Sequence, residues 1–135
     1  MIDQIEEETL DAIGGCSAAN ATTFQVHRDY IDNFSMLNVN MHSMPGNYRS
    51  LLAFLSTLKF RISLIIVTES WFKNVNDIPL FNIQGYKSEF VNRACALGGG
   101  IIVYYLEHIK VSKIIEFTNI FPTHEGLALN VSLPH

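Results

Sequence analysis

The fold class follows from residues 34–71, which read FSMLNVNMHSMPGNYRSLLAFLSTLKFRISLIIVTESW. The spacing of the apolar side chains over 35–40 predicts a first strand there. A Met-Pro-Gly-Asn turn with a helix cap, at 44–47, precedes a helix that runs to 58, because leucines recur there with helical spacing. Residues 62–67 are a short apolar run rich in β-branched side chains, as in a strand buried on both faces. The stretch therefore predicts a β-α-β unit in an α/β protein.

Two polar side chains lie where these predicted strands end. Asn40 closes the first strand, and Glu69 follows the second. A right-handed crossover makes the two strands parallel, so both carboxyl ends reach one edge of the sheet, where α/β folds bind their ligands. We therefore expect the amide and the carboxylate to converge on one crevice. An amide can donate to a phosphate oxygen, and a carboxylate is a suitable ligand for Mg²⁺.

Each of these two residues also has a purely structural interpretation. Asn40 is suited to an Asx turn that closes the strand. Glu69 is suited to the first turn of a helix, with Thr68 or Ser70 as its cap and Trp71 packed beneath. From the residues alone, both interpretations stay open.

The chain after residue 97 is rich in predicted strands. A triple glycine at 98–100 leads into an apolar strand at 101–106, and further strands are expected at 109–117 and 127–133. The glycines do not form a phosphate-binding loop, since no Lys-Ser or Lys-Thr pair follows and the next element is a strand. We expect them to permit close backbone approach or a bulge. Neither the five histidines nor the two cysteines have the spacing of metal ligands.

The charges divide the chain into two parts. The 135 residues carry a net charge of -4, yet residues 1–33 hold seven acids against Arg28 alone, a net -6, whereas residues 34–135 hold eight bases and six acids, a net +2. We expect residues 1–33 to be an acidic, mostly disordered leader, with a short frayed helix over Asp3 to Ile13. A nucleic-acid partner is not excluded, because the acidity belongs to the leader and not to the body.

The sequence features that bear on cellular location predict an intracellular protein. The amino terminus is acidic and lacks the apolar core of a signal peptide, and no run approaches the ~18 apolar residues of a membrane span. Cys16 and Cys95 form no CxxC pair. We expect an intracellular protein with reduced thiols and no membrane partner.

The same features, taken in order, resemble a known family. They are Asn40-x-x-Ser43, the helix over 47–58, Ile65-Ile66-Val67-Thr68-Glu69-Ser70-Trp71, Gly85-Tyr86, Arg93 and Gly98-Gly99-Gly100-Ile101. This set resembles the amino-terminal half of the endonuclease/exonuclease/phosphatase domain in non-LTR retrotransposon (LINE-type) reverse transcriptase polyproteins. The likeness covers about residues 34–133 of the chain.

The resemblance implies a fold and an activity. The fold would be a four-layer αββα sandwich of the DNase I-like type, present here in part, with residues 34–135 as the amino-terminal half of the domain. The activity would be Mg²⁺-dependent nicking of DNA in the nucleus. Glu69 would be the metal ligand, and Asn40 the active-site amide that orients phosphate and metal-bound water. No catalytic role carries over to Tyr86, Arg93 or the glycines.

The sequence also departs from the family pattern. His42 stands where the family usually has Arg, and the later Gly-Asp-x-Asn and Ser-Asp-His motifs would lie beyond His135. Phosphodiester hydrolysis needs a base and stabilisation of developing charge besides the metal, so we expect the chain to be inactive by itself. Half of a sandwich is also expected to expose an apolar sheet face, which invites self-association. Two alternatives stay open: a non-catalytic DNA- or protein-binding module derived from the domain, and a phosphatase of the same superfold.

Overall fold

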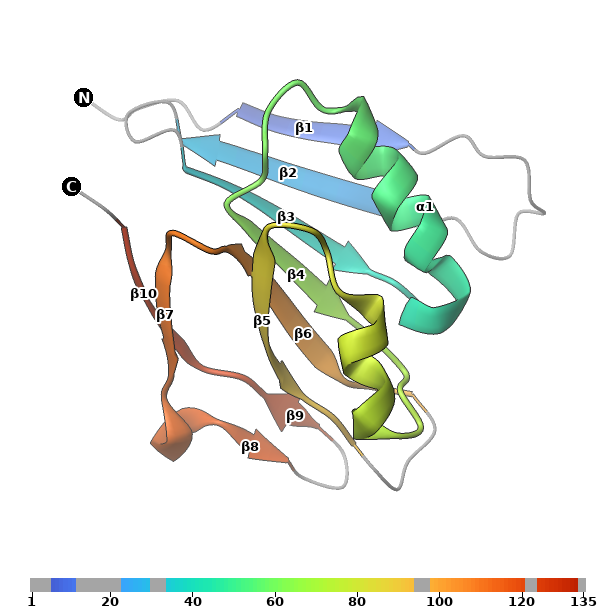
Figure 1. The fold of residues 1–135 in the computed structure, drawn as a ribbon, viewed down its shortest axis with the longest axis vertical. Helices are drawn as coiled ribbons and strands as arrows, with labels where there is room; N and C mark the ends of the chain where they lie inside the picture. Colours follow the sequence, from blue (N-terminus) through green and yellow to red (C-terminus); the bar gives the residue numbers. More distant parts are fainter. Residues whose placement is uncertain (1–5, 12–22, 30–33, 94–97, 121–123, 134–135) are drawn as a thin grey trace.

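The computed structural model describes residues 6–11, 23–29, 34–93, 98–120 and 124–133, and its architecture is mixed α/β. A six-stranded mixed sheet forms its centre, with the strand order β1-β2-β3-β4-β6-β5 (Figure 1). The predicted α/β class is therefore confirmed. The strands of this sheet are β1 (Glu6–Asp11), β2 (Thr23–Asp29), β3 (Phe34–Asn40), β4 (Leu64–Thr68), β5 (Tyr86–Val91) and β6 (Ile101–Leu106).

The predicted β-α-β unit is present. Strands β3 and β4 are parallel, with Asn40 beside Thr68 at the end of the ladder. Helix α1 (Met44–Thr57) connects them and begins earlier than predicted, because the Ser43 hydroxyl caps it by accepting a hydrogen bond from Gly46 N–H at 3.2 Å. The proline that we assigned to a turn instead lies in the first turn of the helix, where its fixed φ is already helical.

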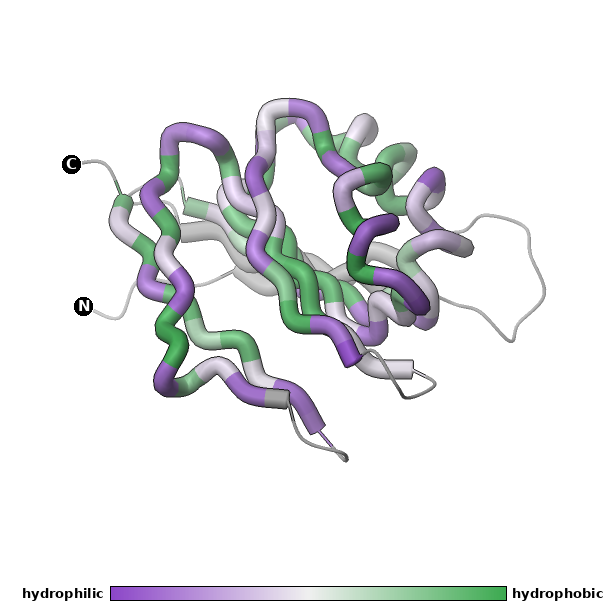
Figure 2. The backbone as a smooth tube through the Cα atoms, turned by 60° about the horizontal axis from the view of Figure 1, so that its bottom comes forward, coloured by the Kyte–Doolittle hydropathy of each residue, from purple (hydrophilic) through white to green (hydrophobic). Residues whose placement is uncertain are grey.

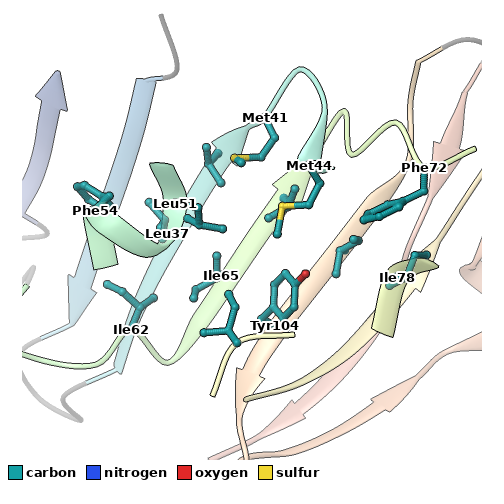
Figure 3. Packing of buried hydrophobic residues seen from close by; sticks show 14 residues of the cluster. Leu37, Met41, Met44, Leu51, Phe54, Ile62, Ile65, Phe72, Ile78 and Tyr104 are labelled. Carbon is teal, nitrogen blue, oxygen red and sulfur yellow. The ribbon is translucent and has the colours of Figure 1, made fainter. Parts of the chain in front are cut away.

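The helices bury one face of the sheet. Helix α1 and the 3-10 helix η1 (Val75–Phe81) lie on the same side of it (Figure 1). Figure 3 shows side chains of the two layers meeting there, among them Leu37 of β3 and Leu51 of α1, both fully buried. Tyr104 of β6 is buried in the same core, where its hydroxyl donates to the Phe81 carbonyl at 2.7 Å and burial raises its pKa. This core fixes where β3 and β4 end.

A smaller layer covers part of the opposite face of the sheet. Strands β7 (Lys110–Lys113) and β10 (Leu129–Ser132) pair antiparallel. Figure 2 shows this pair beside the main sheet, on the side away from the helices. The apolar face expected to be exposed is therefore partly covered, and the described elements form three layers. The side chains that meet in this second core are Val111, Leu129 and Val131 with Leu64, Val103 and Tyr105.

The strand expected over 109–117 is shorter than predicted. It ends at Lys113 and is followed by the 3-10 turn η2 (Ile115–Phe117). Thr118 closes this turn, since its N–H and its hydroxyl both donate to the Ile114 carbonyl, at 3.0 and 2.9 Å.

The strand expected over 101–106 is confirmed. A short hairpin of β8 (Asn119–Ile120) and β9 (Glu125–Gly126) follows η2, and β10 occupies the middle of the last predicted strand.

The helix expected in the leader is wrong where the structure describes that segment. Strand β1 replaces the helix expected over Asp3 to Ile13, and β2 pairs with both β1 and β3. The physical reason is that β3 would otherwise present an unpaired edge, and Thr23, Phe24 and Val26 are strand-forming residues that the charge count did not weigh. The rest of residues 1–33 lies outside the described part of the chain.

Candidate functional site

The structure brings the two predicted site residues to one edge of the sheet. Asn40 is the last residue of β3, and Glu69 directly follows β4. Past the ends of β3 and β4, the two segments of the backbone remain hydrogen-bonded to each other. Met41 N–H donates to Thr68 O at 3.0 Å, and Ser43 N–H donates to Glu69 O at 2.9 Å. Asn40 and Glu69 therefore lie where two neighbouring segments leave the sheet side by side.

The Glu69 carboxylate is held at one of its oxygens. Oε2 accepts a hydrogen bond from the Trp71 indole Nε1–H at 2.5 Å and another from Gly99 N–H at 3.0 Å. These two donors lower the pKa of Glu69, the indole foremost; burial opposes them, and the Arg93 charge adds to them. Oε1 accepts no hydrogen bond from the residues that the structure describes. Glu69 is therefore a charged ligand group with one oxygen available.

Asn40 closes its strand with an Asx turn, which confirms the structural interpretation of this residue. Its Oδ1 accepts a hydrogen bond from His42 N–H at 3.3 Å. The turn uses only the amide oxygen, and the amide nitrogen donates to no atom in the described ranges. The side chain is exposed. Its NH₂ group is therefore available to an acceptor such as a phosphate oxygen.

The helical interpretation of Glu69 is wrong. The next helix along the chain is η1, which begins several residues later and is capped by Asn74, whose side chain accepts a hydrogen bond from Asn76 N–H at 3.0 Å. Trp71 does not pack beneath a helix either, since it is 41% exposed while Phe72 is buried in the core. A helix dipole thus does not explain the carboxylate.

Left-handed backbone conformations concentrate in the two loops. Four described residues other than glycine have a positive φ: His42 at 46°, Ser43 at 104°, Glu69 at 54° and Trp71 at 55°. Such conformations cost on the order of 1–3 kcal/mol each and cluster at functional sites. The His42 and Trp71 rings also meet edge to face across the loops, with centroids 6.0 Å apart. The fold thus concentrates strain beside the amide and the carboxylate.

The triple glycine lines the same edge. All three residues have positive φ, of 84°, 74° and 91°. Ser70 N–H donates to Gly100 O at 3.2 Å, and Trp71 N–H donates to Gly99 O at 2.9 Å. A Cβ at Gly100 would lie 2.3 Å from Ser70 Oγ. The prediction that these glycines permit close backbone approach is confirmed.

Glu125 is a site residue that the sequence reasoning missed. Its Oε1 accepts a hydrogen bond from Gly100 N–H at 2.5 Å, and its Oε2 lies 2.7 Å from Arg93 Nε. The Arg93–Glu125 contact meets the distance of an ion pair but not the geometry of a hydrogen bond, so we treat it as chiefly electrostatic. No motif marks Glu125, which stands alone before the last predicted strand.

Tyr86 lies away from this edge. Its hydroxyl donates to Ile62 O at 2.6 Å, before the start of β4, and the Arg61 guanidinium carbon lies 5.0 Å from the centre of its ring. Both side chains line a surface hollow of about 570 Å³ at that end of the sheet. The hollow has neither an acidic side chain nor a histidine in its lining. We therefore locate the candidate site by its chemical groups and not by concavity.

The groups at the edge fit a single magnesium ion that keeps most of its water. Mg²⁺ is commonly bound by one or two protein carboxylates together with waters and substrate phosphate. Glu69 offers one such oxygen. No group of three or more His, Cys, Asp or Glu side chains gathers anywhere in the described ranges. The donor set thus suits a magnesium site completed by substrate and not a closed metal centre.

Comparison with known proteins returned no matching family model, curated protein or solved structure. Within the described part of the chain, no helix is both long enough and apolar enough to cross a membrane.

Proposed function

We propose that this chain is the amino-terminal half of a Mg²⁺-dependent DNA endonuclease domain of the endonuclease/exonuclease/phosphatase type, as in non-LTR retrotransposons. The observation that carries the proposal is that Asn40 and Glu69 both lie at the carboxyl ends of the parallel strands β3 and β4, where Asn40 pairs with Thr68 and Ser43 N–H donates to Glu69 O. Asn40 offers an amide NH₂ and Glu69 a carboxylate oxygen that no described residue hydrogen-bonds. The ordered motifs of the sequence support the same conclusion.

Each residue supplies one part of phosphodiester hydrolysis. Glu69 would hold Mg²⁺ through the oxygen that Trp71 and Gly99 leave free, and the bound metal supplies Lewis-acid activation. Asn40 would donate to a phosphate oxygen and so orient it. The sequence offers no match to the motifs that provide the base and the imidazole. We therefore propose that the chain by itself binds metal and phosphate without efficient hydrolysis.

In such a domain, the described layers would be part of a larger sandwich. The helical layer, the six-stranded sheet and the β7–β10 pair would be three layers of an αββα sandwich, with the fourth contributed by the other half of the domain. Ile115 and Phe117 of η2 are 77% and 69% exposed. They contribute apolar surface through which a half-domain would self-associate. Action on chromosomal DNA would place the protein in the nucleus.

A magnesium titration tests the role of Glu69. Trp71 is the single tryptophan and contacts the carboxylate directly, so its fluorescence reports on a ligand bound there. We expect a saturable response in the native chain and none in Glu69→Gln. Glu89→Gln is the matched control, because it removes a carboxylate that pairs with Lys113 at 3.5 Å, away from the site. An equal response in Glu69→Gln, confirmed by calorimetry, would contradict the proposal.

Plasmid nicking in Mg²⁺ separates the proposal from its alternatives. We expect the chain to nick supercoiled DNA no faster than Glu69→Ala, and robust nicking that this substitution abolishes would show that the chain is active alone. Salt-dependent duplex binding that survives Glu69→Ala, without any magnesium response, would indicate a non-catalytic binding module. Hydrolysis of a small phosphoester but not of DNA would indicate a phosphatase.

A further inference from the structure

We infer that Glu125 and Arg93 are a positioning pair, which sets the direction of the Glu69 carboxylate through the glycine segment 98–100. The inference deepens the proposed function, on which it depends for what Glu69 does. The contacts that carry it involve neither metal nor DNA.

The first contact joins Glu125 to the glycine segment. Glu125 Oε1 accepts the Gly100 N–H at 2.5 Å, although the two residues are 25 positions apart. The Glu125 side chain is only 8% exposed. A carboxylate this buried needs a compensating charge or donors. Gly100 N–H supplies one donor, and the guanidinium of Arg93 supplies the charge.

Arg93 contacts the neighbouring glycine as well as Glu125. Its Nε lies 2.7 Å from Glu125 Oε2. Its guanidinium also lies against Gly99, since a Cβ at Gly99 would come within 2.3 Å of Arg93 Nη2. The pair therefore holds both glycines, Gly99 by packing and Gly100 by a hydrogen bond.

One peptide unit transmits this constraint. Gly99 O and Gly100 N–H belong to the same planar peptide group, and in a trans peptide they point in opposite directions. Glu125 accepts from the N–H, while Trp71 N–H donates to the carbonyl at 2.9 Å. The peptide is thus fixed from both sides. Rotating it would break the contact to Glu125 and the contact to the Glu69–Trp71 segment together.

The same glycine then reaches the site residue itself. Gly99 N–H donates to Glu69 Oε2 at 3.0 Å, and the Trp71 indole donates to the same oxygen. Which carboxylate oxygen stays free therefore depends on where Gly99 is held. Glu125 and Arg93 determine that position without touching Glu69.

The indole resonance of Trp71 provides the test. With one tryptophan in the chain, a ¹H–¹⁵N spectrum contains one indole N–H peak, and its position reports the hydrogen bond to Glu69. We expect Glu125→Gln to move this peak most of the way to its position in Glu69→Gln. Arg93→Lys should move it in the same direction. Both variants should weaken the magnesium response of Trp71 by about 10-fold, as losing a residue that orients a metal ligand typically does.

Glu89→Gln is again the matched control, because it breaks the Lys113–Glu89 ion pair with the same change in charge. If the pair were purely structural, Glu125→Gln would have a lower thermal midpoint, but its indole peak would lie at the same position as in Glu89→Gln. That result would overturn the inference. Glutamine has the size of glutamate but lacks the charge that pairs with Arg93 and strengthens the bond to Gly100 N–H, so Glu125→Gln should fold and still loosen the glycine segment. If it does not fold, Arg93→Lys decides by the same criterion. An indole peak that moves as expected in a chain that binds no magnesium would overturn the proposed function and support the positioning role.

Discussion

Trp71 and Glu69 are joined by a hydrogen bond of 2.5 Å from the indole Nε1–H to Oε2, and both residues have a left-handed backbone, with φ of 55° and 54°. The residue between them, Ser70, is buried and is bonded through its N–H to Gly100 O. An indole that donates to a carboxylate favours its charged form and limits its rotation. The Trp71 side chain is therefore held in its exposed position by a polar contact with Glu69 and not by burial in the core.

Replacing Trp71 by Phe should raise the pKa of Glu69 toward its ordinary value of 4.5, because the indole hydrogen bond is the largest cause of the lowered pKa. A pKa that is lower in the folded than in the unfolded chain adds stability above about pH 4.5, and this stability is lost as the pH falls through the folded pKa. Trp71→Phe should thus lower the free energy of unfolding more at neutral pH than in strong acid. Carboxyl ¹³C shifts and urea unfolding at both pH values measure the two effects.

The Glu69→Gln background is the control for this experiment. There, Trp71→Phe has no carboxylate to act on, so its effect on unfolding should not vary with pH. An unchanged Glu69 pKa in Trp71→Phe would show that Gly99 N–H alone holds the charged form.

Gly99→Ala should destabilise the protein by about 1–3 kcal/mol, because an L-residue is strained at positive φ. The glycine has a φ of 74°, and the new methyl group would meet the Arg93 guanidinium at 2.3 Å. Gly46→Ala is the contrasting variant, since Gly46 lies in the first turn of α1 without a positive φ and alanine favours the helix. It should cost clearly less than Gly99→Ala, because its methyl group would meet only the Ser43 side chain, with Oγ at 3.3 Å. Equal losses in denaturant unfolding would mean that the glycine segment does not depend on its backbone conformation.

The centre of the fold could be predicted because its signals are local. The apolar spacing in β3, the leucine spacing in α1 and the apolar run of β4 each indicate one element. The handedness of the crossover then makes the strands parallel, and Asn40 and Glu69 reach one edge as a consequence. The topology of the β-α-β unit is thus sufficient to predict that Asn40 and Glu69 lie at the same edge of the sheet.

The rest of the site depends on contacts between distant parts of the chain. Arg93 and Glu125 meet although they lie far apart in sequence, and no periodicity or motif connects them. The strands β1 and β2 were missed for a related reason. Their pairing satisfies the edge of β3, whereas a count of charges describes only how each segment interacts with water.

Leu51→Ala should cost about 2–5 kcal/mol of stability, the usual range for a leucine removed from a packed core. Leu51 is fully buried between α1 and the sheet. The neighbouring Leu52 is 36% exposed, so Leu52→Ala is a control with the same chemical change at a more exposed position of the helix. It should cost about 1 kcal/mol or less. Similar losses for both variants, measured by urea unfolding, would show that α1 does not pack on the sheet in this register.

Asn40→Asp should separate the structural role of Asn40 from its proposed binding role. Aspartate retains an oxygen for the His42 N–H and so preserves the Asx turn, but it replaces the NH₂ donor by a second acceptor and adds a negative charge. Its stability should stay close to that of the native chain, whereas Asn40→Ala should lose about 0.5–1.5 kcal/mol of stability with the hydrogen bond.

Both variants should bind a labelled DNA duplex more weakly in Mg²⁺ at low salt, and the aspartate variant more so because it repels phosphate. Asn38→Asp is the matched control, since Asn38 is exposed two positions earlier on the same strand. Fluorescence anisotropy measures the difference, and equal binding by Asn40→Asp and Asn38→Asp would exclude Asn40 from the phosphate site.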